Sequence, residues 1–143
     1  MFCGLDVGKA EHHACALSPA GKRLHDRPLP DDEAALAQVF TPLAEYGPVL
    51  VIVDQPASIG ALPIAVAGSL SIEVAYLPGL AMRRIADLYP GEGNTDARDA
   101  YVIADAARTM PTPCAGSAPT TKPSPNCPCW PATTTASPPR PPA

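Results

Sequence analysis

The sequence predicts an α/β domain, a mixed sheet with helices on both faces, in residues 1–110 of the 143. Short apolar runs alternate with turn residues over the first thirty positions, as they do in antiparallel strands. Beyond them, apolar runs of strand length alternate with segments whose apolar residues recur every three or four positions, which is the pattern of helices. The predicted order is therefore three strands followed by alternating helices and strands.

The first predicted strand, residues 1–7, is an apolar run that contains one acid, Asp6. A carboxylate in a buried strand is costly unless it is paired or bound to a metal. Two more strands follow, separated by the turn residues 19–21. His12 and His13 are adjacent, so a strand points them to opposite faces, and we expect both at the surface or at a strand edge.

The strongest predicted strand, residues 49–53, follows a helix that begins with the acids at 31–33. All five of its residues are apolar, which suits a strand covered on both faces. Asp54 stands at its C-terminal end, where open α/β sheets place their chemistry. The alternative for Asp54 is a plain strand-to-helix turn with an Asx or Ser cap.

Residues 59–66, 72–77 and 80–89 continue the alternation as helix, strand and helix. Arg83 and Arg84 are candidates for phosphate contacts, and the alternative is that they belong to a solvated helix face.

The last predicted helix begins near Thr95 and carries Asp96 and Asp99 in its first turn. Two carboxylates three residues apart lie about 60° apart on one helix face, so both can reach one cation. The alternative is that they favour the helix N-terminus, which Thr95 or Asn94 caps.

This order of elements is that of a ribonuclease-H-like fold, in which the first strand is central and the fourth lies beside it. Asp6 and Asp54 can then face each other, and the last helix can lay Asp96 and Asp99 over the same spot. Like charges this close raise one another's pKa values, and two divalent cations, Mg²⁺ or Mn²⁺, relieve the repulsion. Metals about 4 Å apart would activate the attacking oxygen and stabilise the leaving 3′-oxygen of a phosphodiester.

Three stretches also resemble the DEDD transposases of the insertion-sequence 110 family, which includes the Piv-type DNA invertases. They are Gly-Leu-Asp-Val-Gly-Lys at 4–9, Val-Ile-Val-Asp-Gln-Pro at 51–56, and Asn-Thr-Asp-Ala-Arg-Asp-Ala at 94–100. The resemblance implies a RuvC-like N-terminal domain with a Mg²⁺-dependent catalytic tetrad at Asp6, Asp54, Asp96 and Asp99. The second member is commonly Glu in the family, and Asp54 is one methylene shorter.

The resemblance further implies that the parent enzyme recombines its element with target DNA, is guided by a structured RNA of the element, and works as a homo-oligomer. It also implies a C-terminal domain with a serine nucleophile. We find no such domain within these 143 residues, so we expect the chain not to be competent alone.

Residues 111–143 hold 11 of the 20 prolines, no acid and no apolar periodicity, so we expect a disordered, low-complexity tail. If the codons of residues 112–139 are read one base earlier, with TCN serines, the code forces Leu at 127 and 130 and Ala at 131. An apolar, helix-like pattern then appears. Our hypothesis is that the tail is a frameshift product and the chain the truncated remnant of a longer transposase.

The formal charge of −4 argues against binding nucleic acid by net charge, although it leaves a metal-dependent nuclease open. The charged residues near the start argue against a signal peptide, and no stretch is long enough to span a membrane, so we expect a cytoplasmic protein. Cys3 and Cys15 are interpreted as small buried apolar residues.

Two other classes stay open. The segment 4–8, Gly-Leu-Asp-Val-Gly, is similar to the first phosphate loop of the sugar-kinase and actin-like ATPases, which need a second such loop and a longer chain. The other alternative is a non-catalytic module that binds RNA or partner protomers.

Overall fold

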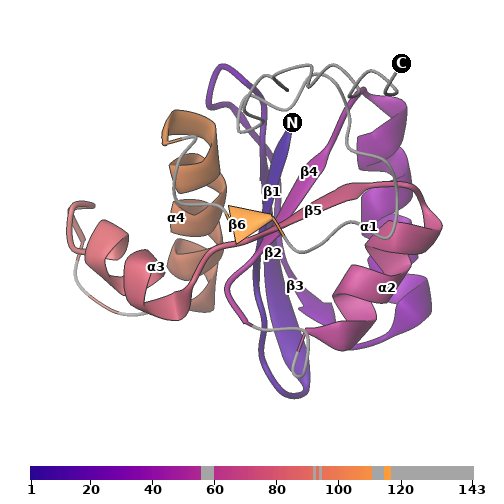
Figure 1. Ribbon diagram of the computed structural model, residues 1–143, viewed down its shortest axis with the longest axis horizontal. Helices are drawn as coiled ribbons and strands as arrows, with labels where there is room; N and C mark the ends of the chain where they lie inside the picture. Colours follow the sequence, from indigo (N-terminus) through magenta and orange to yellow (C-terminus); the bar gives the residue numbers. More distant parts are fainter. Residues whose placement is uncertain (56–59, 92, 94, 111–114, 117–143) are drawn as a thin grey trace, which may run out of the picture.

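The computed structural model describes residues 1–55, 60–91, 93, 95–110 and 115–116 as one layered α/β unit (Figure 1). The strands are β1 Phe2–Asp6, β2 Glu11–Leu17, β3 Arg23–Pro30, β4 Leu50–Val53, β5 Glu73–Tyr76 and β6 Ala115–Gly116. The helices are α1 Glu33–Glu45, α2 Ala61–Ser69, α3 Gly79–Ala86 and α4 Asp96–Thr109.

The sheet is mixed, in the order β3-β2-β1-β4-β5-β6. β1 pairs antiparallel with β2 and parallel with β4, and β4 pairs parallel with β5. The first strand is thus central and lies beside the fourth. The predicted ribonuclease-H-like order, with helices on both faces, is confirmed.

Each face of the sheet carries its own helix layer. α1 and α2 lie on one face, and α3 and α4 lie on the other (Figure 1). Leu36 and Phe40 of α1 pack with Leu5 and Val53 in the first layer, while Ile103 of α4 packs with apolar residues of β4, β5 and α3 in the second. This burial of apolar surface on both faces stabilises the sheet that carries the acids.

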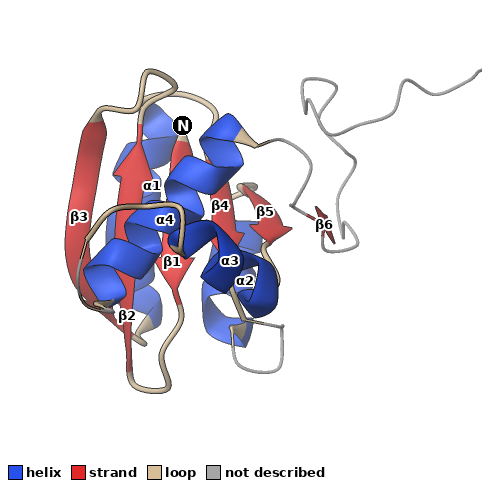
Figure 2. Cartoon of the chain, turned by 90° about the vertical axis from the view of Figure 1, so that its left-hand side faces the viewer, coloured by secondary structure: helices blue, strands red, loops and turns tan. Residues whose placement is uncertain are grey.

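α4 approaches β1 closely because the residues between them are small. It crosses β1 and β2 (Figure 2), and Gly4 of β1 lies against its backbone. A Cβ on Gly4 would lie 2.5 Å from the amide nitrogen of Ala104 and would also collide with the carbonyl oxygen of Ala100. Glycine is therefore required here for close packing, and not for an unusual backbone conformation.

Cys3 and Cys15 are both fully buried, as predicted, and lie on opposite faces of the sheet. Cys3 packs in the α1 layer, whereas Cys15 packs beneath Ala100 and Ala104 of α4. Burial raises the pKa of Cys3 to about 12 and that of Cys15 to about 11. Both thiols are therefore neutral and unreactive in the folded state.

One expectation is wrong for His12. The two histidines do point to opposite faces, but His12 is only 2% exposed, and its Nε2 lies 3.0 Å from an Asp31 oxygen. The residue faces the α1 layer, and the acid before the helix is the partner that makes its burial tolerable.

Within the predicted tail, residues 111–143, the structure describes only β6, which pairs antiparallel with Ala75 and Tyr76. The predicted disorder and the frameshift hypothesis otherwise concern residues outside the described ranges. No helix in the described part of the chain is long and apolar enough to cross a bilayer.

Candidate functional site

The site begins where two parallel strands end side by side. Asp6 is the last residue of β1, and Asp54 follows the last residue of β4. The register pairs Leu5 with Val53, so the two acids are the next residues on neighbouring strands. Successive side chains alternate between the faces, and both acids share the face of Gly4, on which α4 packs.

α4 brings the other two predicted acids over this edge. Thr95 is its N-cap, and its hydroxyl accepts a hydrogen bond from the backbone N–H of Arg98 at 3.3 Å. Asp96 and Asp99 lie in the first turn, where the helix dipole favours negative charge. The capping interpretation is therefore correct for Thr95. The capping hydrogen bond uses the Thr95 hydroxyl and neither of the two carboxylates.

The electrostatics of Asp6 reveal that the four acids interact. Burial raises the pKa of Asp6 to about 7, with further contributions from the negative charges of Asp54, Asp99 and Asp96, in that order. His13, the residue directly opposite Asp6 on β2, acts in the other direction and lowers the pKa of Asp6. Three acids from distant segments are thus within electrostatic range of the fourth.

Asp54 and Asp99 also lie where burial disfavours the charged form of their carboxyl groups. Burial raises the pKa of Asp54, although its Oδ1 accepts a hydrogen bond from the Val7 N–H at 3.2 Å. Burial likewise raises the pKa of Asp99, against the positive charge of Arg98. The Oδ1 atom of Asp99 is buried and has no hydrogen-bond partner among the described residues. Such an atom normally has a partner, so the site offers a lone acceptor.

The acids gather without forming a closed ligand shell. Within the described ranges, no three His, Cys, Asp or Glu side chains stand close enough together to hold a metal ion as they are. Asp96, at the start of the helix, is exposed, while Asp6 and Asp99 are half-buried.

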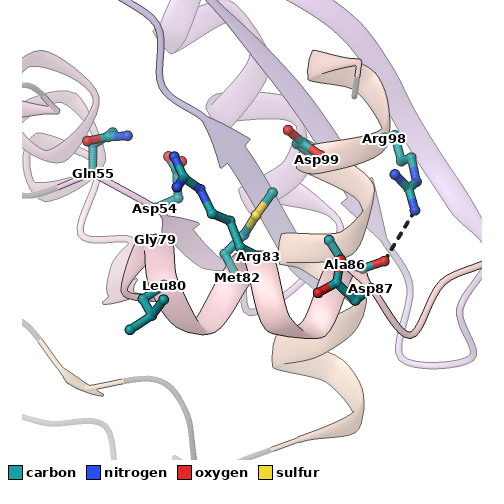
Figure 3. A pocket seen from close by; sticks show the side chains of 10 residues that line it. All are labelled: Asp54, Gln55, Gly79, Leu80, Met82, Arg83, Ala86, Asp87, Arg98 and Asp99. Carbon is teal, nitrogen blue, oxygen red and sulfur yellow. Dashed lines mark hydrogen bonds between the residues drawn. The ribbon is translucent and has the colours of Figure 1, made fainter. Parts of the chain in front are cut away.

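A cavity of about 730 Å³ opens beside this cluster, between the end of β4, α3 and the start of α4 (Figure 3). Both Asp54 and Asp99 line it, so two of the predicted acids face a space that a ligand could enter. The other lining residues are Gln55, Gly79, Leu80, Met82, Arg83, Ala86, Asp87 and Arg98.

Arg98 has a role that the sequence pattern did not reveal. Its guanidinium donates hydrogen bonds to the carbonyl oxygens of Tyr89 at 2.8 Å, Ala86 at 3.2 Å and Gly93 at 3.3 Å. It thereby ties the end of α3 and the following loop to the start of α4. The sequence could not predict these hydrogen bonds, because the acceptors are backbone carbonyl oxygens, which every residue has.

His13 is the second residue that sequence reasoning did not assign to the site. Its Nε2 lies 2.7 Å from an oxygen of Asp26, whose other oxygen accepts a hydrogen bond from Arg23 at 2.6 Å. Arg23 in turn stacks over the ring of Tyr101 on α4, 4.9 Å from its centroid. This chain of contacts joins β2 and β3 to α4 next to Asp6.

Comparison with known proteins agrees with this fold. A family model described as a transposase, that of the DEDD transposases of the IS110 type, matches residues 3–122. The match extends beyond residue 110, where we predict the folded unit to end.

Two relatives are proteins of insertion elements. The chain is 67% identical over 111 residues to the insertion element IS110 uncharacterized 43.6 kDa protein of Streptomyces coelicolor, covering 77% of this chain and 27% of that protein. It is 38% identical over 111 residues to the insertion element IS900 uncharacterized 42 kDa protein of Mycobacterium paratuberculosis, covering 76% and 28%. The chain therefore spans little more than a quarter of these relatives.

Among solved structures, the fold is similar to that of Thermus thermophilus RuvC in complex with a Holliday junction substrate. The TM-score is 0.51 at 14% sequence identity, and the likeness covers 71% of this chain and 88% of that one. Nothing in these comparisons supports the ATPase or the non-catalytic alternative. On its family match, its insertion-element relatives and its RuvC-like sheet, the chain belongs to the DEDD transposase family of the IS110 type.

Proposed function

We propose that this domain supplies the acidic, metal-dependent site at which a transposase cleaves and transfers DNA strands. The observation that carries the proposal is that Asp6 lies within electrostatic range of Asp54, Asp99 and Asp96, whose negative charges add to burial in raising its pKa to about 7. Holding such a cluster together without a cation is costly, and hard oxygen ligands are those that Mg²⁺ and Mn²⁺ prefer.

The chemistry of the donor set suits a divalent metal. All four side chains are carboxylates, and the buried Asp99 Oδ1 has no hydrogen-bond partner among the described residues, so it is available as a ligand. When bound, the metal would activate an attacking oxygen and stabilise the leaving oxygen of a phosphodiester.

The chain's own residues would orient that centre. Asp6 and Asp54 are fixed at the ends of two paired strands, and the Val7 N–H holds one oxygen of Asp54 in place. Asp99 comes from the first turn of α4, whose close packing on β1 sets its distance from the strands. These contacts would fix the position of such a site, which is the main contribution a protein makes to such catalysis.

DNA as the substrate is supported by the family membership and by the Holliday junction in the RuvC complex, which is a property of that protein. Because the chain spans 27% of its Streptomyces relative, the activity of a whole transposase is proposed only for a longer assembly. We propose that such an assembly is a homo-oligomer that uses a guide RNA and a second catalytic domain, and that it works in the cytoplasm, where bacterial DNA lies.

Manganese titration tests the metal site. We expect the wild-type chain to bind Mn²⁺ in calorimetry and Asp99→Asn to bind it at least about tenfold more weakly, because an amide replaces a charged ligand. Asp87→Asn is the matched control: Asp87 lines the same cavity but is not one of the four acids, so its removal should change affinity by less than about twofold. An equal loss of Mn²⁺ affinity in both variants would mean that the metal is attracted by general negative charge and not held by the four acids. A wild type that binds no Mn²⁺ would refute the proposal.

A further inference from the structure

Two arginines line the cavity beside the acids, and they differ in what they contact. The guanidinium of Arg98 is engaged by three backbone carbonyl oxygens. Arg83, on α3, makes no hydrogen bond or ion pair through its side chain with any residue in the described ranges. Figure 3 shows its side chain running along the cavity toward Asp54.

The helix that carries Arg83 is held in place by packing and by a hydrogen bond. Met82 and Ile85 on the same helix are buried against the second core layer, and Arg98 ties the end of that helix to α4. The first residue of α3, Gly79, lies near the end of β4, where an added Cβ would be 3.9 Å from the Asp54 carbonyl oxygen. α3 therefore holds over the edge that carries the acids a guanidinium that has no side-chain partner among the described residues.

A guanidinium that pairs with no carboxylate in the described part of the chain suits a particular ligand in this place. A phosphodiester that approaches four carboxylates meets strong repulsion, which a neighbouring positive charge reduces. A guanidinium presents a planar fork of N–H donors that matches two phosphate oxygens. The alternative is that the Arg83 guanidinium forms an ion pair with Asp54. Among the described residues no such pair is formed.

We propose that Arg83 binds the non-bridging oxygens of a DNA phosphodiester in this cavity and positions it against Asp54 and Asp99. This inference rests on the proposed function and adds to it the residue that receives the substrate. A phosphodiester would then lie between Arg83 on α3 and the carboxylates of Asp54 and Asp99. The adjacent Arg84 does not line the cavity.

Arg84 makes the test sharp. It is on the same helix, carries the same charge and is exposed like Arg83. We would measure the affinity of the 143-residue chain for a fluorescein-labelled four-way DNA junction by anisotropy, in Mn²⁺ and over a range of salt, for wild type, Arg83→Gln and Arg84→Gln. Mn²⁺ affinity and circular dichroism of each variant would be measured in parallel.

We expect Arg83→Gln to bind the junction about tenfold more weakly and to reduce the salt slope by about one, as the loss of one phosphate contact does. Arg84→Gln should stay within about twofold of wild type, and all three proteins should bind Mn²⁺ alike. Equal loss in the two variants would overturn the inference and leave the metal site standing. A change in Mn²⁺ affinity for Arg83→Gln without weaker DNA binding would instead make Arg83 a counter-ion of Asp54. A wild type that binds neither Mn²⁺ nor the junction would refute both proposals.

Discussion

At the scale of single residues, Asp6 links the site to pH. In the metal-free protein it is protonated below about pH 7 when folded, whereas its ordinary pKa is 3.8. The folded state holds one more proton between these values, so the free energy of unfolding should fall as the pH rises from about 4 to about 7. Asp6→Asn removes this titration. We expect the variant to be more stable than wild type at pH 8 in a chelator, by about 1–2 kcal/mol, because water screens a half-buried carboxylate.

Urea unfolding at pH 4 and pH 8 measures this difference. At pH 4 wild-type Asp6 carries its proton in the folded state and the two proteins should unfold at similar urea concentrations. The same advantage for the variant at both pH values would mean that the charge of Asp6 is not what destabilises the metal-free domain.

Sequence reasoning reached some of these residues and missed others for physical reasons. Asp6 and Asp54 could be predicted because an acid within or just after an apolar strand is rare and needs a partner. The buried His12 could not, because its partner Asp31 is 19 positions away and only the fold brings them to 3.0 Å. Arg98 escaped because backbone carbonyl acceptors leave no trace in the sequence.

At the scale of elements, the contact of α4 with β1 decides where Asp99 lies. Gly4→Ala places a methyl group against the backbone at Ala100 and Ala104, which cannot move aside as a side chain would. We expect a loss of about 2–3 kcal/mol in the free energy of unfolding, together with weaker Mn²⁺ binding, since the helix must shift with its acids. Chemical denaturation and calorimetry of the same preparation would measure both quantities.

Gly68→Ala provides the matched control for that substitution. Gly68 lies on α2, and an added Cβ there would meet nothing within 4 Å. Because alanine favours helix over glycine, this variant should be more stable by up to about 1 kcal/mol and should bind Mn²⁺ normally. Unchanged stability in Gly4→Ala would show that α4 can dock on β1 without the close approach described above.

The order of these elements was predictable, whereas their distances were not. Alternation and helical periodicity identified β1 to β5 and the four helices of the described residues, and the order of elements predicted the sheet topology. The requirement for glycine at position 4 depends on which face of β1 meets α4 and at what crossing point. Both are set by packing on small residues such as Ala104, which a periodic pattern cannot distinguish from ordinary core alanines.

At the scale of the whole molecule, a metal bound by these acids would join the first strand to the last helix. Asp6 and Asp99 lie 93 positions apart in the sequence, so global unfolding must separate them. We expect Mn²⁺ at about one hundred times its dissociation constant to stabilise the wild-type chain by about 2.7 kcal/mol. The Asp6→Asn, Asp99→Asn double variant should gain almost nothing. Thermal melting over a range of Mn²⁺ concentrations would measure both, and equal shifts in the two proteins would argue for metal bound elsewhere.

The two buried cysteines make the layers of this molecule separately observable. Cys3 is covered by the α1 side of the sheet and Cys15 by α4, and neither thiol ionises appreciably at neutral pH. A thiol reagent can modify each one only when its own layer opens. The chain has three further cysteines, which would be replaced by Cys114→Ser, Cys127→Ser and Cys129→Ser. The modification rates of Cys3 and Cys15 would then report separately on the opening of the two layers. They would tell whether the helix that carries the acids detaches before the opposite layer does.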